Sequence, residues 1–207
     1  MTVHESDFEP LTAEFFNRPP ELLAPALLGF RLCRDGVTLE ITEVEAYGGP
    51  DDSASHARTG PTARNRPMWG AGGLVYVFLC YGMHRMLNLV SGPEGVPGAI
   101  LIRSARLHEG AARVTERRGP VRRDWLTGPG KVGQALDVHL AMSGRSLLGP
   151  AGLELRAGPP ITRILSGPRI GIDYATASDR RRAWRFATGD GCAVARPKEL
   201  RPWSAHR

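Results

Sequence analysis

The stretch VTLEITEVEAY, residues 37–47, decides the fold. Side chains alternate between the two faces of a β-strand. One parity of this stretch holds three aliphatic residues, then two acids and a tyrosine: Val37, Leu39, Ile41, Glu43, Glu45 and Tyr47. The pattern predicts a strand whose apolar face runs into two carboxylates, and a carboxylate on a core-side face must be paired, protonated or used. A second interpretation stays open, in which the strand leaves the core after Ile41 and both acids are solvated.

The segments on either side extend this strand into a mixed domain. Before it, residues 14–30 predict a short helix, and residues 30–33 predict a strand that pairs with 37–47 across a turn at Asp35-Gly36. After it we expect a long loop over 48–73 and strands over 74–81, 86–89 and 99–104. Helices are expected over 106–118 and 126–138, and two late strands, 169–174 and 183–187, are joined by a polar turn over 175–182. Residues 140–165 are only weakly patterned. Strands mixed with a few helices, without regular βαβ alternation, predict the α+β class.

Composition limits the possible classes of protein. The 207 residues carry 27 Lys and Arg against 21 Asp and Glu, so the formal net charge is 27 − 21 = +6, which admits a polyanionic partner without demanding one. A hydrophobic share of 42% argues against disorder and favours one domain over 1–207, with 1–12 and 195–207 as peripheral tails. No apolar run reaches the roughly 18 residues of a membrane span, and the three cysteines have no zinc spacing. An intracellular protein that does not contact the membrane is therefore expected.

Arg103 is the first candidate partner for the acids. It shares parity with Ala99 and Leu101 in an apolar strand. A buried guanidinium cannot lose its proton, so it needs an acceptor, and Glu45 or a held water would serve. This predicts an acid–arginine pair on neighbouring strands that fixes a water molecule. An ordinary structural ion pair would give the same pattern.

The loop 48–73 is rich in Gly and Pro and carries a cluster of basic and amide side chains: His56, Arg58, Arg64, Asn65 and Arg66. Loops of this length in compact domains are usually functional. Clustered arginine and asparagine suit contacts to phosphate. A solvated basic surface is the alternative interpretation.

Three further features are compatible with nucleic-acid binding. Lys131 follows Gly128-Pro129-Gly130 at a predicted helix start, which suits either a phosphate or an ordinary helix cap. Arg182 belongs to a run of arginines that adds positive charge, although such runs are usually solvated faces. Tyr81 ends the most apolar strand and could protrude as a wedge, although a tyrosine at such a position more often belongs to the core. The sequence contains no P-loop, no GxGxxG and no GxSxG motif, and its histidines are scattered, so no metal site is expected.

Taken together, these stretches resemble the alkyladenine (3-methyladenine) DNA glycosylase family. They span residues 14–187 in order, and they are EFFNRPPELLAPALLG, ITEVEAYGGPDDSASHARTGPTARNRPMW, VYVFLCYGMHRMLNLV, ILIRSARL, LTGPGKVGQAL, GPRIGIDYA and WRF. The combination of EAYxGPxDxASH, RNRPMW and YGMHxMxN is far more specific than any single motif.

The resemblance implies roles for individual residues. Glu45 matches the carboxylate that activates the attacking water, and Arg103 matches the arginine that helps to hold that water. The main-chain carbonyl of Ile172 would be its third partner. Tyr47 and His56 match residues that sandwich the extruded base.

Further positions match the base pocket and the side chains that enter the duplex. Phe78 matches a stacking position and Asn88 an asparagine that lines the pocket, whereas Tyr81, with Met83, matches the group pushed into the DNA. Two departures bear on the breadth of substrates rather than on the reaction. Vertebrate-type members have tyrosine where this chain has Phe78 and also where it has His84.

The implied function is a monofunctional DNA glycosylase of base excision repair. It would flip alkylated purines, with deaminated purines as a further candidate class, out of duplex DNA and hydrolyse the N-glycosidic bond with an activated water, leaving an abasic site. The resemblance also implies a curved, mostly antiparallel sheet flanked by helices, a monomer acting on double-stranded DNA, and no metal or organic cofactor. Two other functions are compatible with the residues: a non-catalytic binder of damaged DNA, and a hydrolase of free purine nucleosides.

Overall fold

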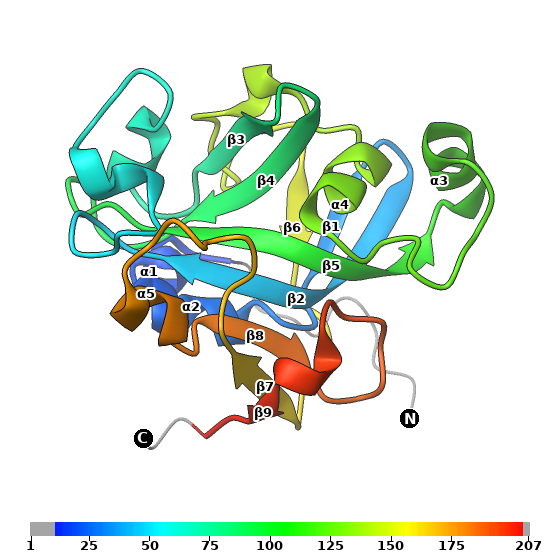
Figure 1. The fold of residues 1–207 in the computed structure, drawn as a ribbon. Coiled ribbons are helices and arrows are strands. Elements are labelled where there is room, and N and C mark those ends of the chain that lie inside the picture. Colours follow the sequence, from blue (N-terminus) through cyan, green and yellow to red (C-terminus); the bar gives the residue numbers. More distant parts are fainter. Residues whose placement is uncertain (1–10, 205–207) are drawn as a thin grey trace.

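The 37–47 stretch forms the central strand of the sheet. The structure, a computed structural model, describes residues 11–204. Strand β2 (Val37–Tyr47) pairs on one edge with β1 (Arg31–Arg34), and the predicted turn between them has positive φ at both Asp35 (47°) and Gly36 (71°). On its other edge β2 pairs with β5 (Ala99–Glu109) along nearly its whole length (Figure 1). Residues 37–46 are therefore all buried.

The remaining strands extend this pair into one curved sheet (Figure 1). Its main path runs β3-β4-β5-β2-β8-β7-β9, while β1 bridges β2 and β6. The other bounds are β3 (Val75–Cys80), β4 (His84–Val90), β6 (Glu154–Arg156), β7 (Ile164–Gly167), β8 (Arg185–Thr188) and β9 (Arg201–Pro202). Every pairing between these strands is antiparallel. The predicted α+β class and the mostly antiparallel sheet are confirmed.

The helices are short and flank the sheet. They are α1 (Ala13–Phe16), α2 (Pro20–Ala26), α3 (Ala111–Arg118), α4 (Pro129–Ala135) and α5 (Ala177–Arg181). The 48–73 loop contains two single 3₁₀ turns, at His56–Thr59 and Arg66–Trp69. Within residues 11–204, no helix has the length and apolar character needed to cross a bilayer.

A local bulge decides which way the acids of β2 point. The register between β2 and β5 shifts on both sides of Glu43, which leaves Thr42 and Arg103 each without an opposite residue. Before the bulge, odd-numbered residues of β2 pack in the main core, whereas after it the even-numbered Val44 and Ala46 do so. The acids therefore face away from the main core. The simple alternation in the sequence predicted that they would continue its apolar face, and this prediction is wrong.

Two predicted helices near the N-terminal half are shorter than expected. The 14–30 helix is split into α1 and α2, because Pro19 and Pro20 cannot continue a helix but suit the first turn of a new one. The 106–118 helix begins only at Ala111. The residues up to Glu109 continue β5, and Gly110 has a left-handed φ of 89° that separates the two elements.

The late strands differ from the prediction in one place. The predicted strand 169–174 is wrong, because this segment consists of bends and turns and Gly171 has a φ of 78°. The actual strand is β7, inside the weakly patterned stretch, and the polar turn 175–182 contains α5. Residues 195–204, the described part of one predicted tail, contribute β9 and Trp203, which packs against the core. Residues 1–10 and 205–207 lie outside the described residues.

Candidate active site

A cavity of about 520 Å³ lies where β3, β4 and β5 face the 48–73 loop and the 169–175 segment. Its walls contain predicted residues from positions far apart in the chain: Tyr47, His56, Arg64, Phe78, Tyr81, Asn88, Arg103 and Ile172. The fold thus brings together the predicted base-pocket residues and two of the three groups predicted to hold the water.

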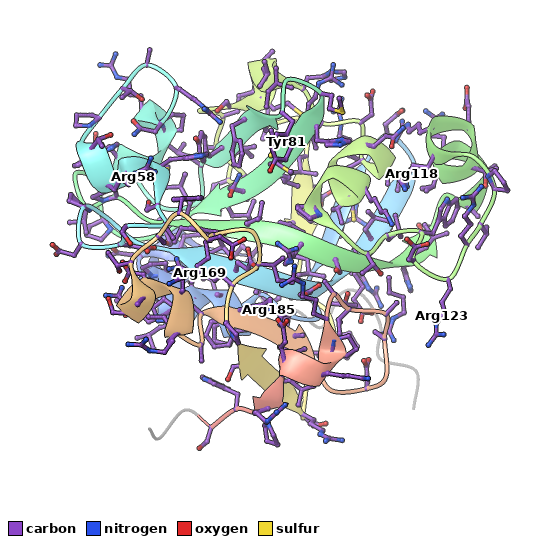
Figure 2. The ribbon with its side chains drawn as sticks, viewed as in Figure 1. Arg58, Tyr81, Arg118, Arg123, Arg169 and Arg185 are labelled. Carbon is purple, nitrogen blue, oxygen red and sulfur yellow. The ribbon has the colours of Figure 1, made fainter. Side chains whose placement is uncertain are left out.

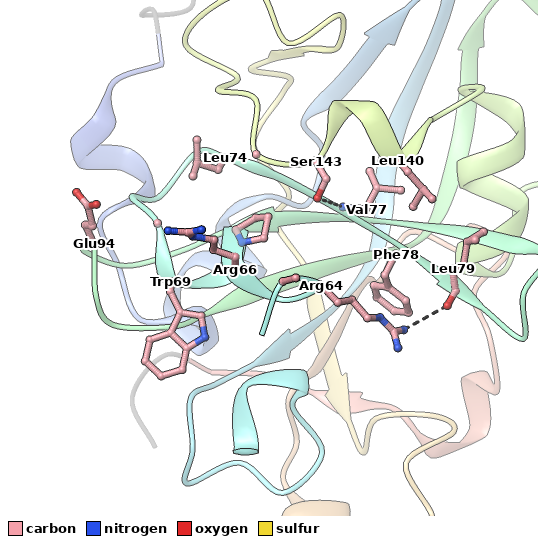
Figure 3. A pocket seen from close by; sticks show the side chains of 14 residues that line it. Arg64, Arg66, Trp69, Leu74, Val77, Phe78, Leu79, Glu94, Leu140 and Ser143 are labelled. Carbon is pink, nitrogen blue, oxygen red and sulfur yellow. Dashed lines mark hydrogen bonds between the residues drawn. The ribbon is translucent and has the colours of Figure 1, made fainter. Parts of the chain in front are cut away.

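A larger, more open hollow of about 840 Å³ runs along the edge strand β3 (Figure 3). Arg64, Arg66 and Trp69 line it together with apolar side chains, and Glu94 is the only acid among the described residues that line it. None of the predicted water-holding groups reaches it. Chemistry, rather than size, therefore identifies the smaller cavity as the candidate active site.

Glu45 is fully buried and lies behind the wall of the 520 Å³ cavity. Three hydrogen bonds hold its carboxylate. The Tyr47 hydroxyl donates to Oε2 at 2.8 Å, Arg103 Nη1 donates to Oε2 at 3.1 Å, and the Ile170 N–H donates to Oε1 at 2.8 Å. All three donors belong to lining residues. Because a carboxylate has about four acceptor sites, one site is left for a water molecule.

A second buried acid, Glu43, stands behind Arg103. It accepts hydrogen bonds from Arg185 Nη1 and from the Ala195 N–H, both at 3.0 Å, and from the Ser104 hydroxyl. The Arg103 Nε lies 3.8 Å from Glu43 Oε1. Arg103 therefore sits between two carboxylates, which keep its guanidinium oriented.

Ile172 and Asn88 each retain acceptor capacity at the cavity. The Ile172 carbonyl accepts one bond from the Ala175 N–H at 2.9 Å, and a carbonyl oxygen has two lone pairs. Asn88 Nδ2 donates to the carbonyls of Tyr76 (3.1 Å) and Met86 (3.2 Å), so its amide oxygen remains as an acceptor. Both residues are buried against the cavity wall.

His56 enters the cavity from the 3₁₀ turn that follows Ser55. Its Nδ1 lies 2.9 Å from the Tyr76 hydroxyl, and its ring meets Phe78 edge-on with centroids 4.5 Å apart. Burial, followed by the charges of Arg64 and Arg58, lowers the pKa of His56 from 6.5 to about 4. The imidazole is therefore neutral at pH 7.

This shift predicts a pH dependence of stability. Because the pKa of His56 is lower in the folded chain, the unfolded chain takes up a proton between pH 6.5 and 4 that the folded chain does not. We expect His56 to reduce the free energy of unfolding by roughly 1–2 kcal/mol as the pH falls from 6.5 to 4, with no effect above 6.5. Urea unfolding of the wild type and of His56→Gln across this range measures it. An equal slope in both proteins would contradict the assignment.

Tyr81 stands at the tip of the β3–β4 hairpin (Figure 2). It is 90% exposed, and both Tyr81 (φ 51°) and Gly82 (φ 70°) are left-handed, as a type I′ turn requires. A left-handed tyrosine costs about 1–2 kcal/mol, and such strain is typical of functional sites. Of the two alternatives for Tyr81, the protruding one is correct. Met83, 70% exposed, lies in the same turn.

The predicted phosphate contacts of the loop separate into two groups. Arg58 and Arg66 are exposed, and Arg64 donates to the Leu79 carbonyl at 3.2 Å over the Phe78 ring. Asn65 needs correction. It is only 2% exposed, and its side chain bonds the main chain of the loop at residues 56, 60 and 62. It shapes the loop and cannot reach a phosphate.

Lys131 and Arg182 both have protein partners. Lys131 Nζ forms an ion pair with Asp124 and donates to its carbonyl at 2.9 Å. Arg182 pairs with Asp179 at 3.0 Å and stacks on the ring of Trp184 at 4.7 Å. Both side chains remain partly exposed, so the structure leaves a DNA contact open to each.

Two buried ion pairs at the site were not predicted. Arg169 and Asp52 form a buried ion pair beside the cavity, and Glu43 and Arg185 form another. Arg169 appeared in the sequence only as the start of a misassigned strand, and its partner lies 117 positions away. An arginine within an otherwise apolar segment, the signal that singled out Arg103, could have indicated that Arg169 and Arg185 are buried, but it does not identify their partners.

The chain is also similar to known DNA glycosylases over most of its length. The family described as Methylpurine-DNA glycosylase (MPG) matches residues 14–191. A DNA-3-methyladenine glycosylase from Arabidopsis thaliana is 47% identical over 208 residues, covering 97% of this chain and 80% of that protein. A protein provisionally named 3-methyladenine DNA glycosylase from Nitrosococcus oceani is 46% identical over 193 residues, covering 93% and 96%. Another, from Streptomyces avermitilis, is 43% identical over 190 residues, covering 87% and 88%.

Proposed function

Since the chain belongs to the methylpurine-DNA glycosylase family, we propose that Glu45, Arg103 and the carbonyl of Ile172 hold and activate the water that releases the damaged base. The chain is a DNA-3-methyladenine glycosylase, a hydrolase of N-glycosyl bonds that acts in base excision repair. Its substrate is damaged DNA.

One observation carries the assignment of the water. Glu45 has three fixed donors and one unused acceptor site, and its donors line the cavity. Arg103 Nη1 holds Oε2 of Glu45 at 3.1 Å, so the carboxylate that would take a proton from the water is fixed in place. As the glycosidic bond lengthens, the sugar gains oxocarbenium character, and the same carboxylate stabilises that cation while the water attacks.

The cavity suits an extruded purine. Alkylation at N3 or N7 makes the base cationic, and a cation is attracted to the faces of electron-rich rings such as Tyr47 and Phe78. His56 is neutral at pH 7, so it can lie against a cationic base without repelling it. The amide of Asn88 lines the same wall. These features support the base-pocket roles of the four residues.

The reaction ends with an abasic site. A glycosylase that also cleaves the strand uses an amine nucleophile, which forms a covalent imine with the sugar. Among the described residues that line the 520 Å³ cavity there is no lysine. We therefore assign water as the nucleophile and a monofunctional reaction. One chain carries all the residues proposed to activate the water and to hold the base, which supports a monomer acting on double-stranded DNA.

Replacing Tyr81 by alanine is expected to weaken extrusion of the base. The ring would fill the gap left in the duplex, and stacking of this kind is worth about 1–3 kcal/mol. We expect the rate of base release from duplex DNA to fall by about 5–150-fold, the rate equivalent of that energy. The loss should be much smaller when the lesion lies in a single strand, where no gap is opened. Equal losses on both substrates would contradict the wedge role.

The proposed function is tested with a duplex that carries one alkylated purine, assayed for released base and for strand breaks at several salt concentrations. We expect free base, an intact strand until alkali is added, and binding that weakens steeply with salt because phosphate contacts release counterions. Binding without release would favour a non-catalytic binder. Release from free nucleosides, independent of Tyr81, would favour a nucleoside hydrolase.

A further inference from the structure

Arg169 is a fully buried cation beside the cavity, at the start of the 169–175 segment (Figure 2). Its guanidinium donates two parallel hydrogen bonds to the Asp52 carboxylate, from Nη1 to Oδ2 at 2.6 Å and from Nη2 to Oδ1 at 2.8 Å. Nη1 also donates to the Ala46 carbonyl at 2.9 Å. This two-point geometry is specific to arginine, because lysine carries a point charge on a flexible stem.

The pair joins the two segments that frame the cavity. Asp52 also accepts from the N–H groups of Gly48 (3.0 Å) and Ala54 (3.1 Å), so it organises the loop that leads to His56. Arg169 is followed directly by Ile170, whose N–H holds Glu45 Oε1 at 2.8 Å. The hydrogen bond from Arg169 to the Ala46 carbonyl attaches the Asp52–Arg169 pair to the end of β2. The position of one donor to Glu45 thus depends on where Arg169 is anchored.

The pair also supports the ring of Tyr47. The Arg169 guanidinium carbon lies 4.8 Å from the centre of that ring and 5.3 Å from the centre of the Trp184 ring. The ring of Tyr47 is therefore fixed by the Arg169 guanidinium and by its own hydroxyl bond to Glu45. Asp52 compensates the charge of Arg169, so no net positive charge stands beside the ring where a cationic base would lie.

We propose that Arg169, with Asp52 as its counter-ion, is a positioning residue for base release. It acts through Ile170 on the carboxylate of Glu45 and through the ring of Tyr47 on the extruded base. The proposal rests on the roles proposed above for Glu45 and Tyr47. Because Arg169 is buried and belongs to neither the cavity lining nor the exposed surface, its loss affects the chemical step more than the binding of DNA.

The test compares Arg169→Met and Arg169→Lys with the wild type. The first readout is the single-turnover rate of 3-methyladenine release from methylated duplex DNA with the enzyme in excess. The second is the dissociation constant for a duplex that carries a tetrahydrofuran abasic-site analogue. Leu32→Ala serves as a matched control, because Leu32 is a fully buried core residue of β1 outside the cavity, and its truncation destabilises the fold without touching the site.

We expect Arg169→Met to slow release by at least about tenfold, since misplacement by 1 Å can cost about 10²-fold. Its dissociation constant should stay within about threefold of the wild type, as for a residue that does not contact DNA. Arg169→Lys should recover part of the lost rate, because it restores the charge opposite Asp52 without the planar fork. Leu32→Ala should keep its rate within about twofold despite a comparable fall in melting temperature.

Two results would overturn the proposal: a rate loss in Arg169→Met no larger than that of Leu32→Ala at an equal fall in melting temperature, or equal losses of rate and affinity. Should Arg169→Met not fold, Asp52→Asn takes its place under the same criteria. Glu45→Gln is measured in parallel. A wild-type rate in that variant would contradict the assignment of the water, whereas loss in Glu45→Gln with retention in Arg169→Met contradicts only the positioning role.

Discussion

Glu45→Gln should slow base release by about 10²–10⁴-fold, the usual contribution of a positioned general base. The amide cannot take a proton from water at neutral pH, and it cannot stabilise the developing oxocarbenium ion as a charge does. Affinity for an abasic-site duplex should stay within about threefold, because Glu45 is fully buried and does not contact DNA directly. Single-turnover release and equilibrium binding, measured on the same preparation, separate the two effects.

The substitution also disturbs local hydrogen bonding. Glu45 accepts at both oxygens, so a glutamine must point its NH₂ group at a donor, either at the Ile170 N–H or at the hydroxyl of Tyr47 and the guanidinium of Arg103. Melting temperature is therefore recorded alongside the rate. Glu40→Gln is the matched control, since Glu40 lies on the same strand and is paired with Arg106 outside the cavity. A Glu45→Gln rate within threefold of the wild type would contradict the role of this carboxylate.

The local features of the site were predictable because they follow from neighbouring residues. The alternation of residues 37–47 and the Asp35-Gly36 turn place β2, and the parity of Arg103 with Ala99 and Leu101 places its side chain in the cavity. Arg103 has no uncharged form available in a protein, so its need for an acceptor is independent of fold detail. The sequence left two acceptors open, Glu45 or a held water, and in the structure Glu45 accepts from Arg103 at 3.1 Å.

The orientation of the acids was not predictable, because it depends on a bulge shared by two strands. Thr42 and Arg103 are the extra residues, and no turn residue or proline marks either position in the sequence. A one-residue shift moves every later side chain to the other face. Periodicity measured along one strand cannot detect this, because the bulge is defined by the register with β5.

Long-range ion pairs form the second class of features beyond the reach of local patterns. Arg185 lies 142 positions from Glu43, and its segment carries several other arginines that are solvated. Only the path of the sheet, in which β8 pairs with β2 at residues 43–45, brings the two together. The predicted strand at 169–174 fails for a local reason instead. Pro168 precedes the segment and Gly171 is left-handed, and the segment forms bends and turns rather than a strand.

Arg185→Met is expected to lower the free energy of unfolding by about 3–5 kcal/mol, the cost of leaving a buried charge without its partner. Arg185 is fully buried, and it donates to Glu43 at 3.0 Å, to Glu199 at 3.1 Å, and to the carbonyls of Pro168 (2.7 Å) and Ala195 (2.6 Å). Methionine fills a similar volume but satisfies none of these acceptors. For a chain of this length the melting temperature should fall by roughly 6–20 °C.

Two comparisons show whether the buried charge is the cause. Adding Glu43→Gln to Arg185→Met removes the orphaned carboxylate, so the double variant should regain part of the lost stability, which a double-mutant cycle measures. Arg113→Met breaks an exposed pair with Asp35, whose side chains are 50% and 48% exposed, and should cost no more than about 1 kcal/mol. Should Arg185→Met cost no more than Arg113→Met, the Glu43–Arg185 pair would not stabilise the fold. Glu43 would then serve only to orient Arg103, whose Nε lies 3.8 Å from Glu43 Oε1.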